Sequence, residues 1–355
     1  MSGYDAYQQF SKLRDKRKKD EGWKESLYET MLHLALLGGK LYARTSGTTG
    51  SPMNIHIKRL DVIHSARLTA DTFDLKEGDR ALHCLPCEFI AGKMMLARAF
   101  ALGLDLHIID PRGSVLDNLR TEDRFRFTAM VPLQLHRALQ EGRARVERQF
   151  DTILLGGGPV SDALIEDLQG LSTTVFLSYG STETVTHVAL RKLNGADGSD
   201  HFAAIGAVTF TIDPRGCLII RTPHLSIKEH ITNDLVELID DHRFRWLGRR
   251  DNVILSGGKK IFPEQLEQRT SGLIPYPHFF TSFPEERLGQ AVMLVLETEQ
   301  PPQETLPEIL ERLVSVLQAH ELPRRVTALR RFERTISGKI QRGRTLGEIG
   351  RARFP

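Results

Sequence analysis

The chain has 355 residues, of which 40% are hydrophobic and 26% are charged, a globular composition with enough apolar residues for one large and one smaller core. Its net charge of +3, from 48 basic and 45 acidic residues, is too balanced to indicate a nucleic-acid partner. Three cysteines cannot build a disulfide framework, and Cys84-x-x-Cys87 lacks the second pair of a structural zinc site. Residues 1–20 lack the apolar core of a secretory signal, and no run of about eighteen apolar residues predicts membrane insertion, so we expect a cytoplasmic protein.

From about residue 60, helical stretches alternate with short apolar runs, which is typical of βα units. Helices are predicted over 61–73 and 93–102, and strands follow them over 81–85 and 106–109. Three more apolar runs bounded by turn residues indicate buried parallel strands, at 127–131, 152–155 and 174–177. The fold class predicted for this region is therefore a large, wound α/β domain.

The pattern changes twice farther along the chain. The turn signal of residues 213–216 lies between two apolar runs and predicts a hairpin, hence a more antiparallel region. After Asp251 the sequence predicts helices over 265–269 and 307–320, with strands near Phe279, over 292–296 and over 326–332. We therefore expect a large domain of residues 1–250 and a small α+β domain of residues 251–355.

The strongest local feature is Thr45-Ser46-Gly47-Thr48-Thr49-Gly50, followed by Ser-Pro. Glycines permit turns that direct successive N–H groups at one anion, and small hydroxyls add donors, so the loop suits phosphate oxygens. It lacks the Gly-Lys-Ser/Thr ending of the nucleotide-hydrolase P-loop, which disfavours kinase or GTPase chemistry. For the segment taken alone, a flexible loop rich in hydroxyls is the alternative.

A second feature, residues 177–183, follows a predicted strand and so lies where open α/β sheets bind ligands. Tyr179 is suited to stack on a base, Thr182 to bond a phosphate, and Glu183 to hold magnesium. An ordinary surface turn is the alternative.

These two features precede four further segments, Thr232-Asn233-Asp234, Gly248-Arg249-Arg250-Asp251, Ser256-Gly257-Gly258-Lys259-Lys260 and Ser337-Gly338-Lys339-Ile340-Gln341-Arg342. In this order they resemble the superfamily of acyl-CoA synthetases, peptide-synthetase adenylation domains and luciferases, over about residues 45–345. The resemblance implies ATP and magnesium, a carboxylic acid substrate, coenzyme A as co-substrate, and a mobile small domain. The large domain would be shorter at its N-terminus than in typical relatives.

The resemblance also assigns roles. Thr45 to Gly50 would close over the ATP phosphates and Tyr179 would pack beside adenine, while Thr182 and Glu183 would serve phosphate and magnesium. Asp234 and Arg249 would bind the ribose hydroxyls.

In the small domain, Asp251 would be the hinge. Lys339 would reach the reacting carboxylate and the α-phosphate, where a fixed positive charge stabilises the transition state. The glycine-rich loop, comprising Ser256, Gly257 and Gly258, would approach the pantetheine thiol after the domain rotates. Met53 replaces a lysine that is common in the family, so weaker ATP binding is expected.

Segments 85–93, 156–161 and 182–187 are similar to compact o-succinylbenzoate–CoA ligases of menaquinone synthesis. Such an acid has a second carboxylate that needs an anchor. Lys93, Gly157 and His187 are the candidate substrate residues, with Lys93 and His187 as the anchors. A solvated Lys93 and a structural His187 are the alternatives.

Three other readings remain open at this point. One is a synthetase that activates another aryl or short acyl acid, and a second is a ligase that delivers the acyl group to a carrier-protein thiol. A third alternative is a catalytically silent protein that binds nucleotide. The sequence leaves the oligomeric state open, including a homodimer.

Overall fold

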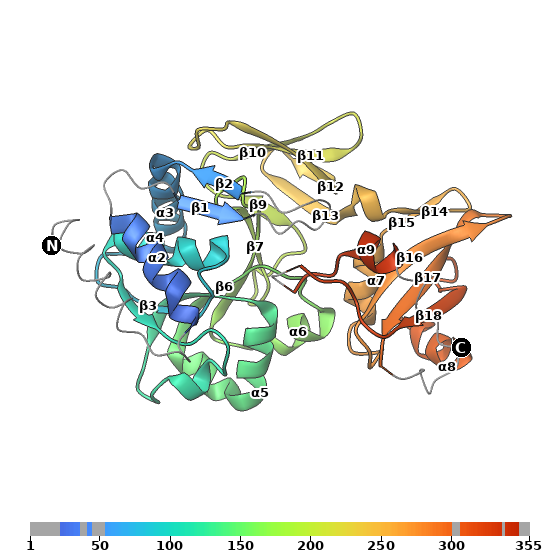
Figure 1. Cartoon of the computed structure of the whole chain (residues 1–355), viewed down its shortest axis with the longest axis horizontal. Coiled ribbons are helices and arrows are strands. Elements are labelled where there is room, and N and C mark those ends of the chain that lie inside the picture. The colour runs from blue at the N-terminus through green and yellow to red at the C-terminus, as the bar shows by residue number, and fades with distance from the viewer. Residues whose placement is uncertain (1–21, 36–40, 45–53, 300–305, 336–337, 348–355) are drawn as a thin grey trace.

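The computed structural model describes residues 22–35, 41–44, 54–299, 306–335 and 338–347 (Figure 1). Its elements in chain order are α2 (Trp23–Ala35), β1 (Leu41–Arg44), β2 (Asn54–Ile57), α3 (Arg59–Phe73), β3 (Arg80–His83), α4 (Ile90–Leu102), β4 (Asp105–Ile108), η2 (Leu116–Asn118), β5 (Phe125–Met130), α5 (Pro132–Gln149), β6 (Phe150–Leu155), α6 (Asp162–Asp167), β7 (Thr174–Gly180), β8 (His187–Lys192), β9 (Phe202–Ala204), β10 (Thr209–Ile212), β11 (Cys217–Arg221), β12 (Glu229–Asp240), β13 (Arg243–Arg249), η3 (Arg250–Asn252), β14 (Ile254–Ser256), β15 (Lys259–Ile261), α7 (Pro263–Thr270), β16 (His278–Glu285), β17 (Gly289–Glu297), α8 (Leu306–Leu313), β18 (Arg325–Leu329) and α9 (Arg342–Gly347).

A sheet of eleven strands organises the larger part of the molecule, in the order β10-β11-β12-β13-β9-β8-β7-β6-β5-β3-β4. The strands from β4 to β7 are parallel, and every pairing beyond β7 is antiparallel. The hairpin expected around residues 213–216 is present as β10 and β11. The predicted α/β fold class is thus confirmed, with parallel strands followed by an antiparallel extension.

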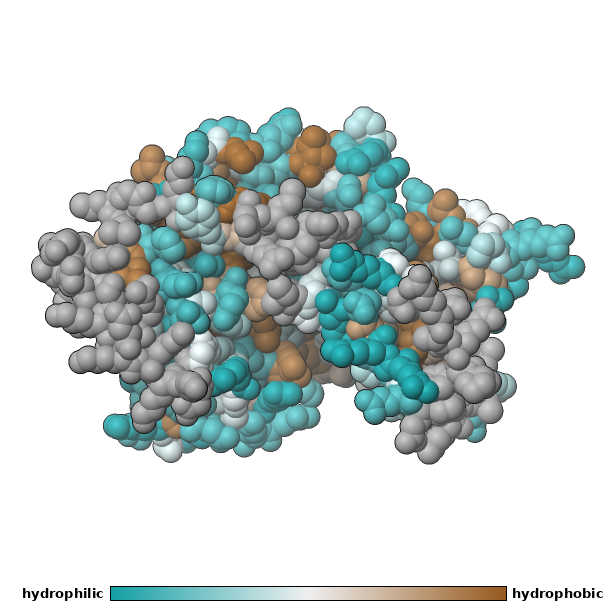
Figure 2. Space-filling model, viewed as in Figure 1, coloured by the Kyte–Doolittle hydropathy of each residue, from teal (hydrophilic) through white to brown (hydrophobic). Residues whose placement is uncertain are grey.

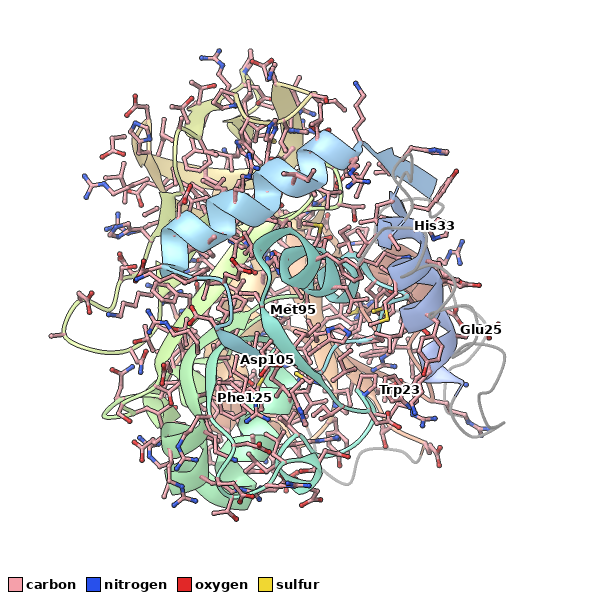
Figure 3. The ribbon with its side chains drawn as sticks, turned by 90° about the vertical axis from the view of Figure 1, so that its left-hand side faces the viewer. Trp23, Glu25, His33, Met95, Asp105 and Phe125 are labelled. Atoms are coloured by element: carbon pink, nitrogen blue, oxygen red, sulfur yellow. The ribbon has the colours of Figure 1, made fainter. Side chains whose placement is uncertain are left out.

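Strand β5 shows why the central runs are apolar throughout. Successive side chains of a strand point to opposite faces, and both faces of this sheet carry helices. Met130 belongs to one buried cluster with Leu135 of α5, whereas its neighbour Ala129 belongs to a second cluster. The second cluster also contains Phe127 of β5 and Phe73 of α3, whose ring centroids are 5.1 Å apart. Figure 3 shows α3 and α4 lying over the sheet, with Met95 of α4 above the strands.

A second, five-stranded sheet follows Asp251, in the order β15-β14-β17-β16, with β18 paired to β17 in parallel. Its two buried clusters contain only residues beyond 253, such as Phe280 and Leu294. Figure 2 shows the surface indented between the parts built around the two sheets. Whether the smaller part swivels about Asp251 remains a prediction.

The structure differs from the sequence predictions at several helices. Helices α2, α5, α6 and α9 were not predicted, and the helix expected over 307–320 ends at Leu313. Ser315 explains the early end, because its hydroxyl donates to the Arg312 carbonyl, a local bond that competes with continued helix. No helix in the described ranges is long and apolar enough to cross a membrane.

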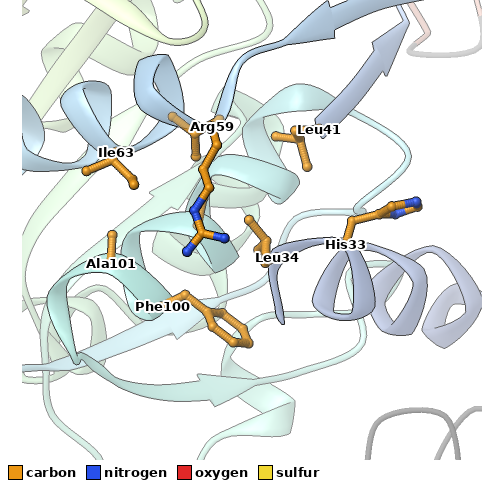
Figure 4. Close-up of a pocket in the computed structure, with 9 residues that line it drawn as sticks. His33, Leu34, Leu41, Arg59, Ile63, Phe100 and Ala101 are labelled. Carbon is orange, nitrogen blue, oxygen red and sulfur yellow. The ribbon is translucent and has the colours of Figure 1, made fainter. Parts of the chain in front are cut away.

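Two surface features lie apart from the predicted site residues. Figure 4 shows a hollow between α2, α3 and α4, lined by apolar side chains and Arg59. In Figure 2, apolar residues interrupt the hydrophilic surface over β10 to β12, where Ile212 and Ile231 are exposed.

His83, at the end of β3, makes the stability of the fold depend on pH. The side chain is buried, and burial lowers its pKa from 6.5 to about 4. Below pH 6.5 the imidazole binds a proton in the unfolded chain but stays neutral in the folded chain. The free energy of unfolding therefore falls as the pH falls. By pH 5 this residue should account for about 2 kcal/mol of lost stability.

Urea unfolding at pH 7 and pH 5 measures this effect. His83→Gln should flatten the dependence on pH, whereas the same change at the exposed His56 should not. An unchanged slope in His83→Gln would show that this imidazole is not held neutral.

Candidate active site

Two side chains from other strands, Tyr179 and Arg249, meet at the Asp234 carboxylate. The Tyr179 hydroxyl, at the end of β7, donates to Asp234 Oδ2 at 2.6 Å. Arg249 is the cross-strand partner of Asp234 in the β12–β13 pairing, and its Nη1 donates to Oδ1 at 3.3 Å. Burial, and next the negative charge of Asp234, raise the pKa of Tyr179 well above its usual value, so the hydroxyl stays protonated and donates. We call these three residues the Asp234 cluster.

Lys339 lies within electrostatic range of the Asp234 cluster. The side chain is accessible to water, yet the surrounding protein lowers its pKa by desolvation; Arg249 lowers it further and Asp234 raises it. Figure 1 shows the segment before α9 extending toward the large sheet. The structure therefore brings together a lysine and an aspartate that are about a hundred positions apart in the sequence.

The turn after β7 is fixed by its backbone. A Cβ on Gly180 would lie 2.3 Å from the Thr186 carbonyl oxygen, so only glycine fits there. The Thr184 hydroxyl accepts from the Ser181 N–H at 2.9 Å and donates within the same turn. Val185 has a φ of 67°, a strained value for a β-branched residue. This turn holds Thr182 and Glu183, and Glu183 is exposed.

Arg98 was not among the site residues predicted from the sequence. This arginine of α4 is 2% exposed, and burial lowers its pKa to about 10. It donates to the Thr186 hydroxyl at 2.8 Å and to the Thr69 hydroxyl at 3.2 Å, and no carboxylate pairs with it in the described part of the chain. A buried cation without a counter-ion is costly, which makes this arginine a candidate anion site.

His187 lies beside Arg98 in the same buried group. Its Nδ1 is 3.1 Å from the Thr186 hydroxyl, and its Nε2 has no hydrogen-bond partner among described atoms. Burial first, and then the charge of Arg98, lower its pKa well below the usual value, so the imidazole is neutral. We call Arg98, Thr186 and His187 the arginine cluster.

The other predicted residues lie in separate places. Lys93 is half-buried, and its pKa is lowered mainly by desolvation, with Cys87, Glu29 and Glu88 acting against this. Gly157 adopts a φ of 80° in the loop after β6.

The remaining predicted residues lie after β13, at or near the predicted hinge. Gly257 and Gly258, with φ of 56° and 79°, form the two-residue turn between β14 and β15, beside the buried Ser256. Asp251 lies in η3 and forms an ion pair with Arg249, with 3.6 Å between Oδ2 and Nη2. The phosphate loop, residues 45–50, lies outside the described residues.

The turn that holds Thr182 and Glu183 lies at the carboxyl end of β7, which is where open α/β sheets bind ligands, and Lys339 approaches from beyond the second sheet. Residues 43–215 match the AMP-binding enzyme family. An acyl-CoA synthetase (AMP-forming)/AMP-acid ligase II-like protein from Dyadobacter fermentans DSM 18053 is 34% identical, with 95% of this chain and 98% of that chain covered and a TM-score of 0.61. The chain belongs to the AMP-binding enzyme family and is an AMP-forming ligase.

Curated relatives carry a more specific name at lower identity. The 2-succinylbenzoate–CoA ligase of Bacillus subtilis (strain 168) is 26% identical over 84% of this chain and 66% of that protein. The enzyme of the same name from Listeria monocytogenes serotype 4b (strain F2365) is 24% identical over 84% of this chain and 68% of that protein. The chain thus spans about two thirds of the length of these relatives. The solved o-succinylbenzoate coenzyme A synthetase from Bacillus subtilis with ATP and magnesium shares the fold, with a TM-score of 0.73 at 23% identity over 86% of this chain and 69% of that chain.

Gly180 gives a direct test of the turn that holds Thr182 and Glu183. Gly180→Ala places a methyl group against a backbone carbonyl, so we expect a loss of about 1–3 kcal/mol in the free energy of unfolding. Urea unfolding measures it. Gly113→Ala is the matched control, because a Cβ there meets only the Asn118 amide at 3.5 Å. Equal stability of the two variants would show that the turn relaxes easily.

Proposed function

We propose that the protein activates a carboxylic acid with ATP and magnesium as an acyl-adenylate, and then transfers the acyl group to coenzyme A. One observation carries this proposal: Lys339, in the part of the chain that carries the smaller sheet, lies within electrostatic range of the Asp234 cluster on the larger sheet. A lysine so placed supplies positive charge at the point where two negatively charged reactants must meet. The family membership of the chain supports the same chemistry.

The residues divide the first step between them. A carboxylate oxygen of the acid attacks the α-phosphorus of ATP, and pyrophosphate leaves. Lys339 would neutralise the charge that develops between the carboxylate and the α-phosphate. Asp234 and Arg249 would hold the ribose, since a carboxylate accepts from hydroxyls and a guanidinium donates to them. Tyr179 packs its ring on Phe244, at 5.0 Å between centroids, and so fixes the hydroxyl that orients Asp234.

Magnesium fits the turn after β7. Glu183 is exposed and makes no ion pair with other described residues, so its oxygens are available to a hard cation. Thr182 would add a hydroxyl. The ion would neutralise phosphate charge, and the phosphate loop, Thr45 to Gly50, would close over the same phosphates.

The arginine cluster favours an acid with a second carboxylate. Arg98 provides an unpaired buried charge, and His187 Nε2, which is neutral and without a partner, can donate if it carries the proton. The names of the curated relatives at 22–26% identity agree with o-succinylbenzoate as that acid. Of the two anchors expected from the sequence, His187 belongs to this cluster, whereas Lys93 lies near Glu29 and Glu88.

A basic pocket beside the smaller sheet favours coenzyme A as the acceptor of the acyl group. A pocket beside Ser256 and Gly257 is lined by three bases, Lys259, His320 and Arg324. Coenzyme A carries three phosphates, and a carrier protein presents only one on its pantetheine arm. A cluster of bases near the predicted thiol approach therefore suits coenzyme A better.

Release of pyrophosphate from ATP, measured with a panel of acids, tests this function. The panel contains o-succinylbenzoate, other aryl acids and short acyl acids, each with and without coenzyme A. We expect release with o-succinylbenzoate and formation of its thioester when coenzyme A is present. Lack of release with every acid would contradict the function and favour a silent nucleotide-binding protein.

Glu183→Gln tests the magnesium site. The amide keeps the shape of the side chain but removes the charge that magnesium prefers, so the magnesium concentration for half-maximal activity should rise at least about tenfold. Titration of pyrophosphate release with magnesium measures it, and Glu166→Gln on the exposed face of α6 is the control. A wild-type titration curve would reduce Glu183 to a structural turn residue.

Arg98→Met tests the second carboxylate. The variant should lose on the order of a hundredfold in kcat/KM for o-succinylbenzoate, and much less for 4-oxo-4-phenylbutanoate, which lacks the ring carboxylate. Arg98→Lys, which keeps the charge, should recover part of the loss. Lys93→Met, assayed beside it, tests the other anchor that the sequence suggests. Equal losses on the two acids in Arg98→Met would contradict the assignment.

A further inference from the structure

Lys339 is carried by a small hairpin whose legs are residues 333–335 and 339–341, here called the lysine hairpin. The Thr335 N–H donates to the Lys339 carbonyl at 2.8 Å, and the Gln341 N–H donates to the Glu333 carbonyl at 2.8 Å. A two-stranded hairpin is marginally stable by itself in water. The position of Lys339 therefore depends on what holds the two legs.

The first leg is held by an ion pair to the end of β17. Arg334 donates through both Nη atoms to the Glu297 carboxylate, at 2.5 Å each. The same carboxylate accepts from the Phe332 N–H at 2.7 Å. Arg334 lowers the pKa of Glu297, and this bidentate geometry fixes direction as well as distance.

The second leg ends at Arg342, which belongs to a clamp on the edge strand β16. Arg342 Nη2 donates to Glu267 Oε2 at 2.7 Å, and Nη1 donates to the Phe280 carbonyl at 2.9 Å. Glu267 Oε1 in turn accepts from the Phe280 N–H at 2.9 Å. Arg342 and Glu267 thus bind the backbone carbonyl and the N–H of Phe280, respectively. These bonds connect α7, β16 and α9.

Arg342 also lies near the hinge. Its Nη2 is 3.8 Å from Glu264 Oε1, an oxygen that accepts from the side chain of Asn252, the neighbour of Asp251. The lysine hairpin and the hinge are therefore connected through two glutamates of α7.

Building on the proposed adenylation, we propose that Arg334 and Arg342 are positioning residues for Lys339, holding the two legs of the lysine hairpin so that the ammonium group meets the acid and the α-phosphate. Neither guanidinium is assigned a contact with substrate. A catalytic charge displaced by about 1 Å loses much of its effect, so the arginines influence the rate through Lys339 alone. Thioester formation, which the glycine-rich loop serves, should not need them.

The two half-reactions, assayed separately, test this inference. Arg342→Gln should slow acyl-adenylate formation by roughly 10- to 100-fold through kcat, with the KM for ATP little changed, while thioester formation from supplied acyl-adenylate stays within about twofold. Arg342→Lys should recover little, because an ammonium cannot donate in two fixed directions to Glu267 and Phe280. Arg334→Gln should behave like Arg342→Gln. Arg344→Gln, an exposed arginine of the same helix, is the control.

A double variant separates positioning from an independent role. If the arginine acts through Lys339, then Arg342→Gln introduced into Lys339→Ala should cause less than about twofold further loss of adenylation. A multiplicative loss in the double variant, or equal slowing of both half-reactions in Arg342→Gln, would overturn the inference. Absence of pyrophosphate release from the unaltered protein would instead overturn the proposed function, so the two failures are distinguishable.

Discussion

The geometry of the site depends on the interactions of the Asp234 carboxylate. Its two oxygens face Tyr179 from the end of the parallel strands and Arg249 from the neighbouring antiparallel strand, and its charge reaches Lys339 from the smaller sheet. The β12–β13 register places Asp234 directly opposite Arg249. A one-residue slip in that register would turn one of the two side chains to the other face, so sheet pairing and active-site geometry are a single constraint.

The arginine cluster shows the opposite situation, a charge without a counter-ion among the described residues. Arg98 donates from Nε and Nη2 to two hydroxyls, which do not balance its charge. Such an arrangement stabilises the protein less than an apolar side chain would, so the residue is best explained by an anionic ligand. The acid would then be recognised at both ends, by Lys339 at the reacting carboxylate and by Arg98 at the other.

Sequence reasoning found the central strands because these are buried on both faces and so have continuous apolar runs, as the neighbours Ala129 and Met130 illustrate. It found Lys339 and Asp234 through a resemblance, yet no pattern in the sequence indicates that the Tyr179 hydroxyl donates to Asp234, since that contact depends on sheet order. Arg98 was missed because an arginine in a helix usually faces solvent. A signal was present: Lys93 and Arg98 are the only charged residues in α4, and a helix that is apolar all round is buried.

The central claim is that the carboxylate of the acid attacks the α-phosphorus of ATP. It is tested most directly by supplying the acid with both carboxylate oxygens labelled with oxygen-18, together with ATP, magnesium and coenzyme A, and analysing the nucleotide product by mass spectrometry. The account predicts AMP that carries one labelled oxygen, left behind when the thiol takes the acyl group. ADP as the product, with the label in phosphate, or AMP without label, would contradict it.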